Sequence, residues 1–135
     1  PDPGEDVLEI GTGCGYHAAV TAELAGEVFS VEYHADLAET ARERLADLGY
    51  DEIAVRHGDG RDGWPEHAPY DRAYLTCGAE QFPRAVVEQV RPGGRIVAPV
   101  GRGRQELVRL TRTADGSVER ERHGGVRFVP MRGDD

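Results

Sequence analysis

The chain has 135 residues, the size of one domain, and its 25 acidic and 16 basic residues give a formal net charge of −9. A surface this acidic repels phosphate backbones, which argues against nucleic-acid binding. No apolar run approaches the roughly 20 residues needed to cross a bilayer and no signal peptide is recognisable, so we expect a cytoplasmic protein without a membrane span.

The first part of the chain alternates short apolar runs with helical patterns. Strands are predicted at Val7–Ile10, Val28–Glu32 and Ile53–Val55, and helices at Tyr16–Ala25 and His34–Leu48. Gly26 and Gly49 follow these helices, where glycine commonly ends a helix. In the second helix, residues at helical spacing are expected to form the buried face, namely Leu37, Ala41, Leu45 and Leu48.

The second part continues this alternation and then changes. Strands are predicted at Asp71–Cys77 and Ile96–Val100, with a helix at Pro83–Val90 and a turn at Arg91–Gly94 between them. The connection from Val100 to Leu107 is too short for a parallel crossover, so a strand at Glu106–Thr111 should run antiparallel. Asp115-Gly116 is a hairpin signal, and the chain returns through Ser117–Val129. We therefore expect an α/β fold with five parallel strands, an antiparallel two-strand edge and helices on both faces.

The loop after the first strand, in the stretch LEIGTGCGYH (residues 8–17), has the composition of a nucleotide-cofactor site. The dinucleotide fingerprint G-x-G-x-x-G fails, because Tyr16 stands where its third glycine belongs. A pyrophosphate would be repelled by Glu9, whereas the sulfonium and ammonium of S-adenosylmethionine would be attracted. The loop therefore favours S-adenosylmethionine, although Glu9 could instead cap nearby amides.

Two further acids end the next two strands. Glu32 closes the second strand, where a carboxylate can accept hydrogen bonds from both ribose hydroxyls. Asp59 follows the third strand and could accept from the adenine amino group. Alone, Glu32 could be a solvated strand end and Asp59 part of a turn. The ordered set of three acids on consecutive strands strengthens the interpretation.

Four segments carry a resemblance to a known family: VLEIGTGCGYHAAV, HGDGRDGWPEHAPYDRAYLT, EQVRPGGRIVAPVG and VRFVPMRG. Together they resemble the protein-L-isoaspartate (D-aspartate) O-methyltransferases over nearly the whole chain. The resemblance implies a Rossmann-like class I methyltransferase fold for residues 1–135. It also implies methyl transfer from S-adenosylmethionine to isoaspartyl carboxylates of damaged proteins, where the ester then collapses to a succinimide.

The resemblance also implies which residues form the site. Those predicted to bind the cofactor are Glu9, Gly11, Gly13, Glu32, Tyr33, Asp59, Gly60 and Gln105, the last near the methionine end. Ala98, Pro99 and Val100 are predicted to border the peptide groove. No catalytic acid or base is predicted, because the acceptor carboxylate is already ionised at neutral pH. The five histidines show no metal-ligand spacing, so no metal site is predicted.

The resemblance has one large departure at the start of the chain. The family carries an N-terminal helical segment with a serine-containing motif that contacts cofactor and substrate, and this chain begins at Pro1. We expect a truncated protein that binds the cofactor weakly or is inactive by itself. Two other functions stay open, a small-molecule methyltransferase and a non-catalytic Rossmann-like binding module.

Composition suggests the remaining properties. Every basic residue other than histidine is arginine, which together with the acidic excess favours a halophilic source over a GC-rich genome alone. Cys14 and Cys77 follow strands whose ends should be neighbours, and reduced thiols are favoured over a disulfide. We expect a monomer.

Overall fold

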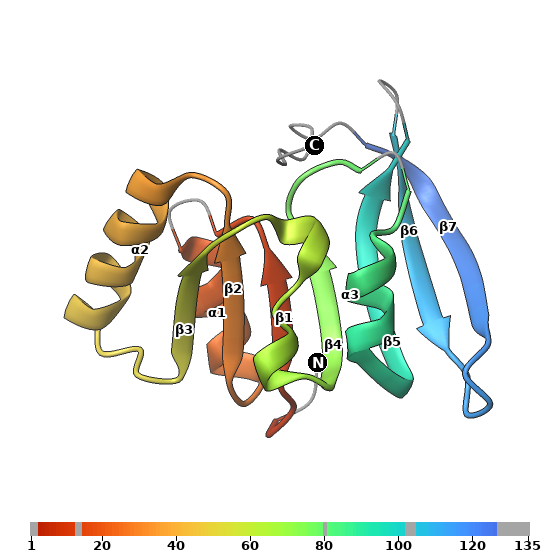
Figure 1. Cartoon of the computed structure of the whole chain (residues 1–135), viewed down its shortest axis with the longest axis horizontal. Coiled ribbons are helices and arrows are strands. Elements are labelled where there is room, and N and C mark those ends of the chain that lie inside the picture. Colours follow the sequence, from red (N-terminus) through yellow and green to blue (C-terminus); the bar gives the residue numbers. More distant parts are fainter. Residues whose placement is uncertain (1–2, 13–14, 80, 102–104, 127–135) are drawn as a thin grey trace.

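The structure is a computed structural model that describes residues 3–12, 15–79, 81–101 and 105–126. Within these ranges one seven-stranded sheet has the order β3-β2-β1-β4-β5-β6-β7 (Figure 1). Its strands are β1 (Val7–Ile10), β2 (Val28–Glu32), β3 (Ile53–His57), β4 (Tyr70–Leu75), β5 (Val90–Val100), β6 (Gln105–Arg112) and β7 (Val118–Val126). The first five run parallel, whereas β6 pairs antiparallel with β5 and β7 antiparallel with β6. The predicted sheet is confirmed.

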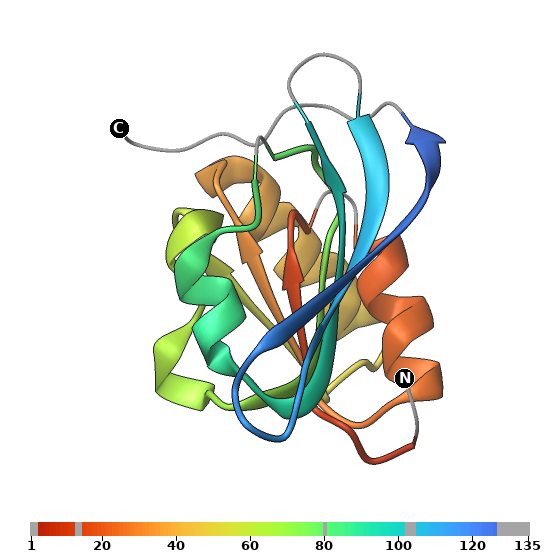
Figure 2. The same ribbon diagram turned by 90° about the vertical axis from the view of Figure 1, so that its right-hand side faces the viewer.

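Helices cover both faces of this sheet. They are α1 (Tyr16–Leu24), α2 (Ala35–Asp47), α3 (Arg84–Gln89) and two 3₁₀ turns, η1 (Gly60–Asp62) and η2 (Pro65–His67). α1 lies on one side of the sheet and α3 on the other (Figure 2). This is the arrangement that right-handed crossovers produce when the strand order reverses between β1 and β4. Among the described helices, none is long and apolar enough to cross a membrane.

Two details of the sequence prediction are wrong. The predicted turn at Arg91–Gly94 lies within β5, which leaves the register of β4 after Val90 and regains it at Arg95. In α2, Leu37 and Leu48 are 42% and 66% exposed, and the buried residues are Ala38, Ala41 and Leu45. Small alanines let the helix lie close to the sheet edge, which turns the outer leucines toward solvent.

The main core fills the sheet face beneath α3. Leu8 and Ile10, alternate residues of β1, both point into this core. The other buried residues of the cluster include Phe29, Val31, Tyr70, Ala73, Leu75, Phe82, Val86, Ile96 and Ala98. A smaller cluster under α1 contains Ala18, Ala22 and Val28. The alternation places every second residue of β1, including Glu9, on the α1 face.

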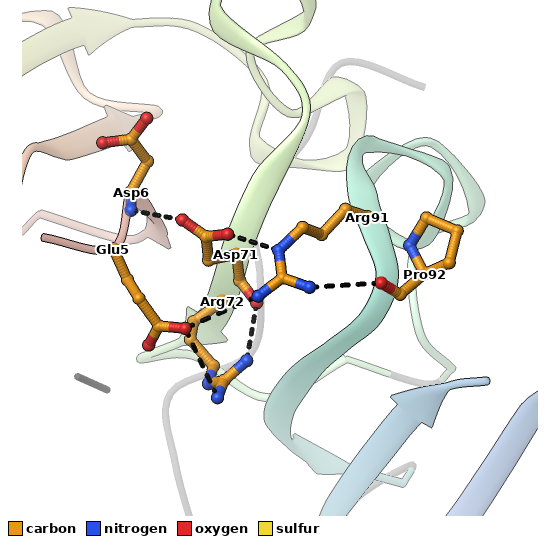
Figure 3. A network of polar contacts seen from close by, with 6 residues as sticks. All are labelled: Glu5, Asp6, Asp71, Arg72, Arg91 and Pro92. Atoms are coloured by element: carbon orange, nitrogen blue, oxygen red, sulfur yellow. Dashed lines mark hydrogen bonds and ion pairs between the residues drawn. The ribbon is translucent and has the colours of Figure 1, made fainter. Parts of the chain in front are cut away.

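An ion-pair network ties together the amino ends of β1, β4 and β5 (Figure 3). Asp71 accepts hydrogen bonds from Arg91 Nε and from the Asp6 amide, the latter at 2.8 Å. Arg91 and Arg72 also approach Glu5, at 3.6 and 3.5 Å. Burial raises the pKa of the Asp71 carboxyl, but the bonds from Arg91 and Asp6 outweigh it and hold that pKa below its usual value. This network lies at the edge opposite to the strand ends that carry the predicted site.

Replacing Arg91 with glutamine should lower the free energy of unfolding by about 1 kcal/mol at neutral pH, because both partners are partly exposed. The folded pKa of Asp71 is depressed, so its contribution is present above the unfolded value near 3.8 and is lost as pH falls through the folded pKa. Urea unfolding of both proteins should therefore differ at neutral pH and converge in acid. Arg84→Gln, which breaks the exposed Arg84–Glu88 pair, is the control and should have a smaller effect. Equal losses in the two variants at neutral pH would contradict this.

Candidate functional site

The predicted cofactor residues gather where the parallel strands end. Gly11 follows β1, Glu32 closes β2, and Asp59 comes two residues after β3. Backbone bonds hold these ends side by side, since the Gly11 amide donates to Val31 O at 2.8 Å and the Gly58 amide to Glu32 O at 2.9 Å. The carboxyl edge of an open α/β sheet is where ligands bind in such folds. Gly13 and Cys14 lie outside the described residues.

Gly11 allows the backbone to turn closely over β4. Its φ is +97°, and a Cβ at this position would lie 2.3 Å from Thr76 Oγ1. Any side chain here would both strain the backbone and push Thr76 away. The Cys77 thiol borders the same place, 3.8 Å from that Cβ position. Burial, and then the charge of Glu32, raises the pKa of this thiol to about 11, so it is protonated at neutral pH.

Glu9 is completely buried on the α1 face of β1. Its carboxylate accepts hydrogen bonds from the hydroxyl of Ser30 on β2 and from Tyr74 OH on β4, the latter at 2.5 Å. The outer hydroxyls are bonded in turn, with Thr12 Oγ1 2.5 Å from Ser30 Oγ and Thr21 Oγ1 3.0 Å from Tyr74 OH. Glu9 is therefore linked through the Ser30 hydroxyl to Thr12, which belongs to the glycine loop. Its predicted role at the positive end of the cofactor stays a prediction.

The environment of Glu9 changes its acidity. Burial, as the largest cause, and the charge of Glu32 raise its pKa to about 7, against the hydrogen bonds from Ser30 and Tyr74, which lower it. Burial and the bond to Glu9 likewise raise the pKa of Tyr74 well above its usual value. A carboxyl group with a pKa near neutrality is thus connected through Ser30 to Thr12.

Glu32 and Tyr33 lead from β2 into α2. Glu32 is 6% exposed, and its Oε2 accepts from the His34 amide at 3.0 Å, at the start of α2. The Tyr33 ring is half-buried and meets the His34 ring edge-on at 5.4 Å between centroids. The His34 amide therefore helps to hold the carboxylate at the carboxyl edge of the sheet.

Asp59 is held by its neighbour Arg61. Its Oδ1 accepts from the Arg61 amide at 3.0 Å and from Nε at 3.2 Å, and its Oδ2 accepts from the guanidinium at 2.8 Å. The next residue, Gly60, is buried against β1, where a Cβ would lie 2.3 Å from Ile10 Cγ2. An adenine amino group at Asp59 would share the carboxylate with Arg61. The sequence analysis did not anticipate this ion pair.

The remaining predicted residues lie at the ends of β5 and β6. Gln105 is 3% exposed beneath Gly78, where a Cβ would meet its amide at 2.0 Å. Ala98 and Pro99 are buried, and Val100 is half-buried. Pro99 O accepts from the Ala79 amide at 2.9 Å, so the ends of β4 and β5 stay together. Of the three predicted groove residues, Val100 has the side chain most available to a peptide.

Sequence reasoning missed Thr12, Ser30, Tyr74 and Thr21 as parts of the site. Ser30 and Tyr74 stand directly opposite Glu9 in the strand register. Polar residues inside otherwise apolar strands were a visible signal, but their partners lie 21 and 65 residues away. Among the described residues no cluster of histidine, cysteine and acidic side chains could hold a metal ion.

The chain is similar in sequence to known proteins of one family. The model of the family described as protein-L-isoaspartate(D-aspartate) O-methyltransferase matches residues 2–135. A protein-L-isoaspartate O-methyltransferase 2 of Archaeoglobus fulgidus is 49% identical over 134 residues, covering 97% of this chain and 61% of the relative. A protein-L-isoaspartate O-methyltransferase of Brucella anthropi is 50% identical over 132 residues, covering 96% of this chain and also 61% of the relative.

Solved structures agree on the fold. A protein-L-isoaspartate O-methyltransferase superposes with a TM-score of 0.91 at 32% identity, covering 98% of this chain and 43% of that one. A Plasmodium falciparum protein in complex with S-adenosyl-L-homocysteine superposes with a TM-score of 0.79 at 19% identity, covering 98% and 68%. The chain thus spans about three fifths of the length of the curated relatives it matches. It belongs to the protein-L-isoaspartate(D-aspartate) O-methyltransferase family.

Proposed function

We propose that the protein containing this chain transfers the methyl group of S-adenosylmethionine to the carboxylate of isoaspartyl residues in damaged proteins. The observation that carries the proposal is the family match over residues 2–135 on a chain that places Gly11, Glu32 and Asp59 at the carboxyl ends of β1, β2 and β3. Residues 1–135 form the cofactor-binding domain. The relatives are longer proteins, and this chain covers 61% of each of them.

The described residues fit this cofactor. Glu32 is oriented at the end of β2 for ribose hydroxyls, Asp59 follows β3 for the adenine, and the Gly11 backbone leaves no room for a side chain. Gln105 is assigned to the methionine end, with Tyr33, Gly13 and Gly60 completing the cofactor site. Ala98, Pro99 and Val100 are assigned to the edge of the peptide groove.

S-adenosylmethionine, when bound, supplies an electrophilic methyl group. The acceptor carboxylate is ionised at neutral pH, so it needs no general base. The residues of this chain then act by binding and aligning the two reactants, which can supply several kcal/mol of the barrier reduction. The protonated Cys77 thiol is not a nucleophile in this scheme.

The test uses the full-length protein and a matched pair of peptides, one isoaspartyl and one aspartyl, with methyl-labelled cofactor at molar salt. We expect label in the isoaspartyl peptide alone. Equal labelling of the pair, or none in the isoaspartyl peptide, would overturn the repair function and favour a small-molecule acceptor. Calorimetry of the 135-residue chain with S-adenosylhomocysteine and NAD tests the cofactor separately. Tighter binding of NAD would contradict the cofactor assignment.

Three further proposals concern the partners, the location and oligomeric state, and the source of the protein. The net charge of −9 opposes binding to nucleic acid, and the protein acts on proteins or peptides instead. We infer that it works in the cytoplasm as a monomer. A halophilic source accounts for the acidic, lysine-free composition, and it predicts that stability rises with salt concentration.

A further inference from the structure

The hydrogen bonds around Glu9 form one continuous chain of side chains. It runs from Thr12 in the glycine loop through Ser30 on β2 to Glu9, and on through Tyr74 on β4 to Thr21 on α1. Thr12 is 4% exposed and Ser30 and Glu9 are completely buried, so this arm of the chain is shielded from water. The chain links the loop beside the candidate cofactor site to the helix beneath it.

The number of protons shared by these five side chains determines in which direction each hydrogen bond is donated. An ionised carboxylate only accepts hydrogen bonds, so Ser30 and Tyr74 must both donate to Glu9. Each hydroxyl has a single proton, and therefore Thr12 must donate to Ser30 and Thr21 must donate to Tyr74. With Glu9 ionised, all four hydroxyl groups point toward the carboxylate.

A neutral Glu9 brings one extra proton, and one arm must reverse. The phenol of Tyr74 is a stronger acid and a poorer acceptor than the hydroxyl of Ser30. The neutral carboxyl group therefore donates its hydrogen bond to Ser30 rather than to Tyr74. Ser30 then donates to Thr12, and the Thr12 hydroxyl proton turns away from Ser30. The charge of Glu9 is thereby transmitted to the loop as the direction of one hydroxyl group.

We propose that Glu9 is a positioning residue that acts on the glycine loop through Ser30 and Thr12, and that proton uptake from solvent at Glu9 reverses this arm. The role differs from direct contact between Glu9 and a ligand. The reversal itself is independent of the proposed function, whereas its effect on cofactor binding rests on that function.

The surroundings of Glu9 place both states within the neutral range. Burial and the charge of Glu32 together raise its pKa to about 7, against the hydrogen bonds from Ser30 and Tyr74. Of the described side chains, Glu32 on β2 is the charged group that faces Glu9 and Tyr74 on β4 is a second titratable group. α1 contributes the uncharged Thr21. The side chains of Tyr16 and His17 lie outside the described residues.

The first test needs no ligand. In the folded 135-residue chain, we expect the Thr12 methyl resonance to titrate with a midpoint near 7, because its hydroxyl reverses with Glu9. Glu9→Gln and Ser30→Ala should abolish this titration. Tyr74→Phe should keep it with a higher midpoint, since one donor to the carboxylate is lost.

Two results would overturn the proposal. One is a Thr12 resonance that does not titrate in the wild type, a measurement that depends on no variant. The other is a Ser30→Ala protein that retains the wild-type titration, because Thr12 would then sense the charge of Glu9 through space. If Ser30→Ala does not fold, Thr12→Val decides instead, because without the hydroxyl the methyl resonances of residue 12 titrate only if they sense the charge of Glu9 through space.

The second test measures S-adenosylhomocysteine binding by calorimetry. We assign the binding-competent loop to the state with Glu9 ionised and the Thr12 hydroxyl directed toward Ser30, so the affinity should rise about tenfold between about pH 6 and about pH 8, as that fraction grows. Glu9→Gln, which can donate toward Ser30 as the neutral acid does, should bind weakly at both pH values. It retains every other titrating group of the protein and the ligand, so it isolates the contribution of Glu9.

The outcomes of the two tests separate the two proposals. Equal wild-type affinities at both pH values would overturn the link between Glu9 and the cofactor while leaving the proposed function intact. Absence of binding at every pH would count against the cofactor assignment of this chain, and the Thr12 titration would still decide whether the arm reverses.

Discussion

Replacing Gly60 with alanine is expected to lower the free energy of unfolding by about 1–3 kcal/mol, the usual cost of overpacking a filled core. The added Cβ would lie 2.3 Å from Ile10 Cγ2, and Ile10 is 2% exposed within the main core. Its branched side chain has no free space to move into. The adjacent Asp59 would shift with the backbone, so S-adenosylhomocysteine binding should weaken as well. Urea unfolding and calorimetry measure the two effects.

Gly58→Ala is the matched control for this prediction. A Cβ at Gly58 would lie 3.5 Å from Arg56 Nε and 3.7 Å from Val31 Cγ1, which are ordinary van der Waals distances. It is the same substitution two residues earlier in the same loop, and it should cost much less. If both variants unfolded at the same urea concentration as the wild type, the close approach of Gly60 to β1 would be refuted.

Glu32→Ala should weaken S-adenosylhomocysteine binding by about 1.5–3 kcal/mol, or roughly 10- to 150-fold, because hydrogen bonds from the ribose hydroxyls to a charged group are lost. The loss also removes the acceptor for the His34 amide at the start of α2, so stability should fall by about 1 kcal/mol. Calorimetry at a pH where both proteins are folded measures the affinity.

Two control variants show whether the loss of affinity comes from the hydrogen bonds of Glu32 or only from removal of a negative charge. Glu43→Ala removes an exposed carboxylate from the outer side of α2 and should leave the affinity unchanged. Glu32→Gln retains a carbonyl acceptor, so its affinity for S-adenosylhomocysteine should lie between those of the wild type and Glu32→Ala. An unchanged dissociation constant in Glu32→Ala would remove this residue from the cofactor site.

Much of the fold could be predicted from local patterns. The ends of β1 and β2 match the prediction, because the apolar run of β1 is followed by Gly11 and that of β2 ends at the acidic Glu32. The antiparallel edge followed from the short connection after Val100, which cannot hold a crossover. Only half of the residues predicted for the buried face of α2 are buried, because helical spacing does not indicate which of two neighbouring rows of side chains faces the sheet.

The sequence by itself determined the parallel sheet and placed the glycine loop, Glu32 and Asp59 at one edge, because all parallel strands end on the same side. Only the tertiary structure decided what these groups contact. Strand register sets Ser30 and Tyr74 beside Glu9, and the turn after β3 brings Arg61 onto Asp59. Residues 21 and 65 positions from Glu9 become its neighbours only when the sheet forms. Local patterns determine where a strand ends, whereas long-range pairing determines which side chains share the buried space beneath it.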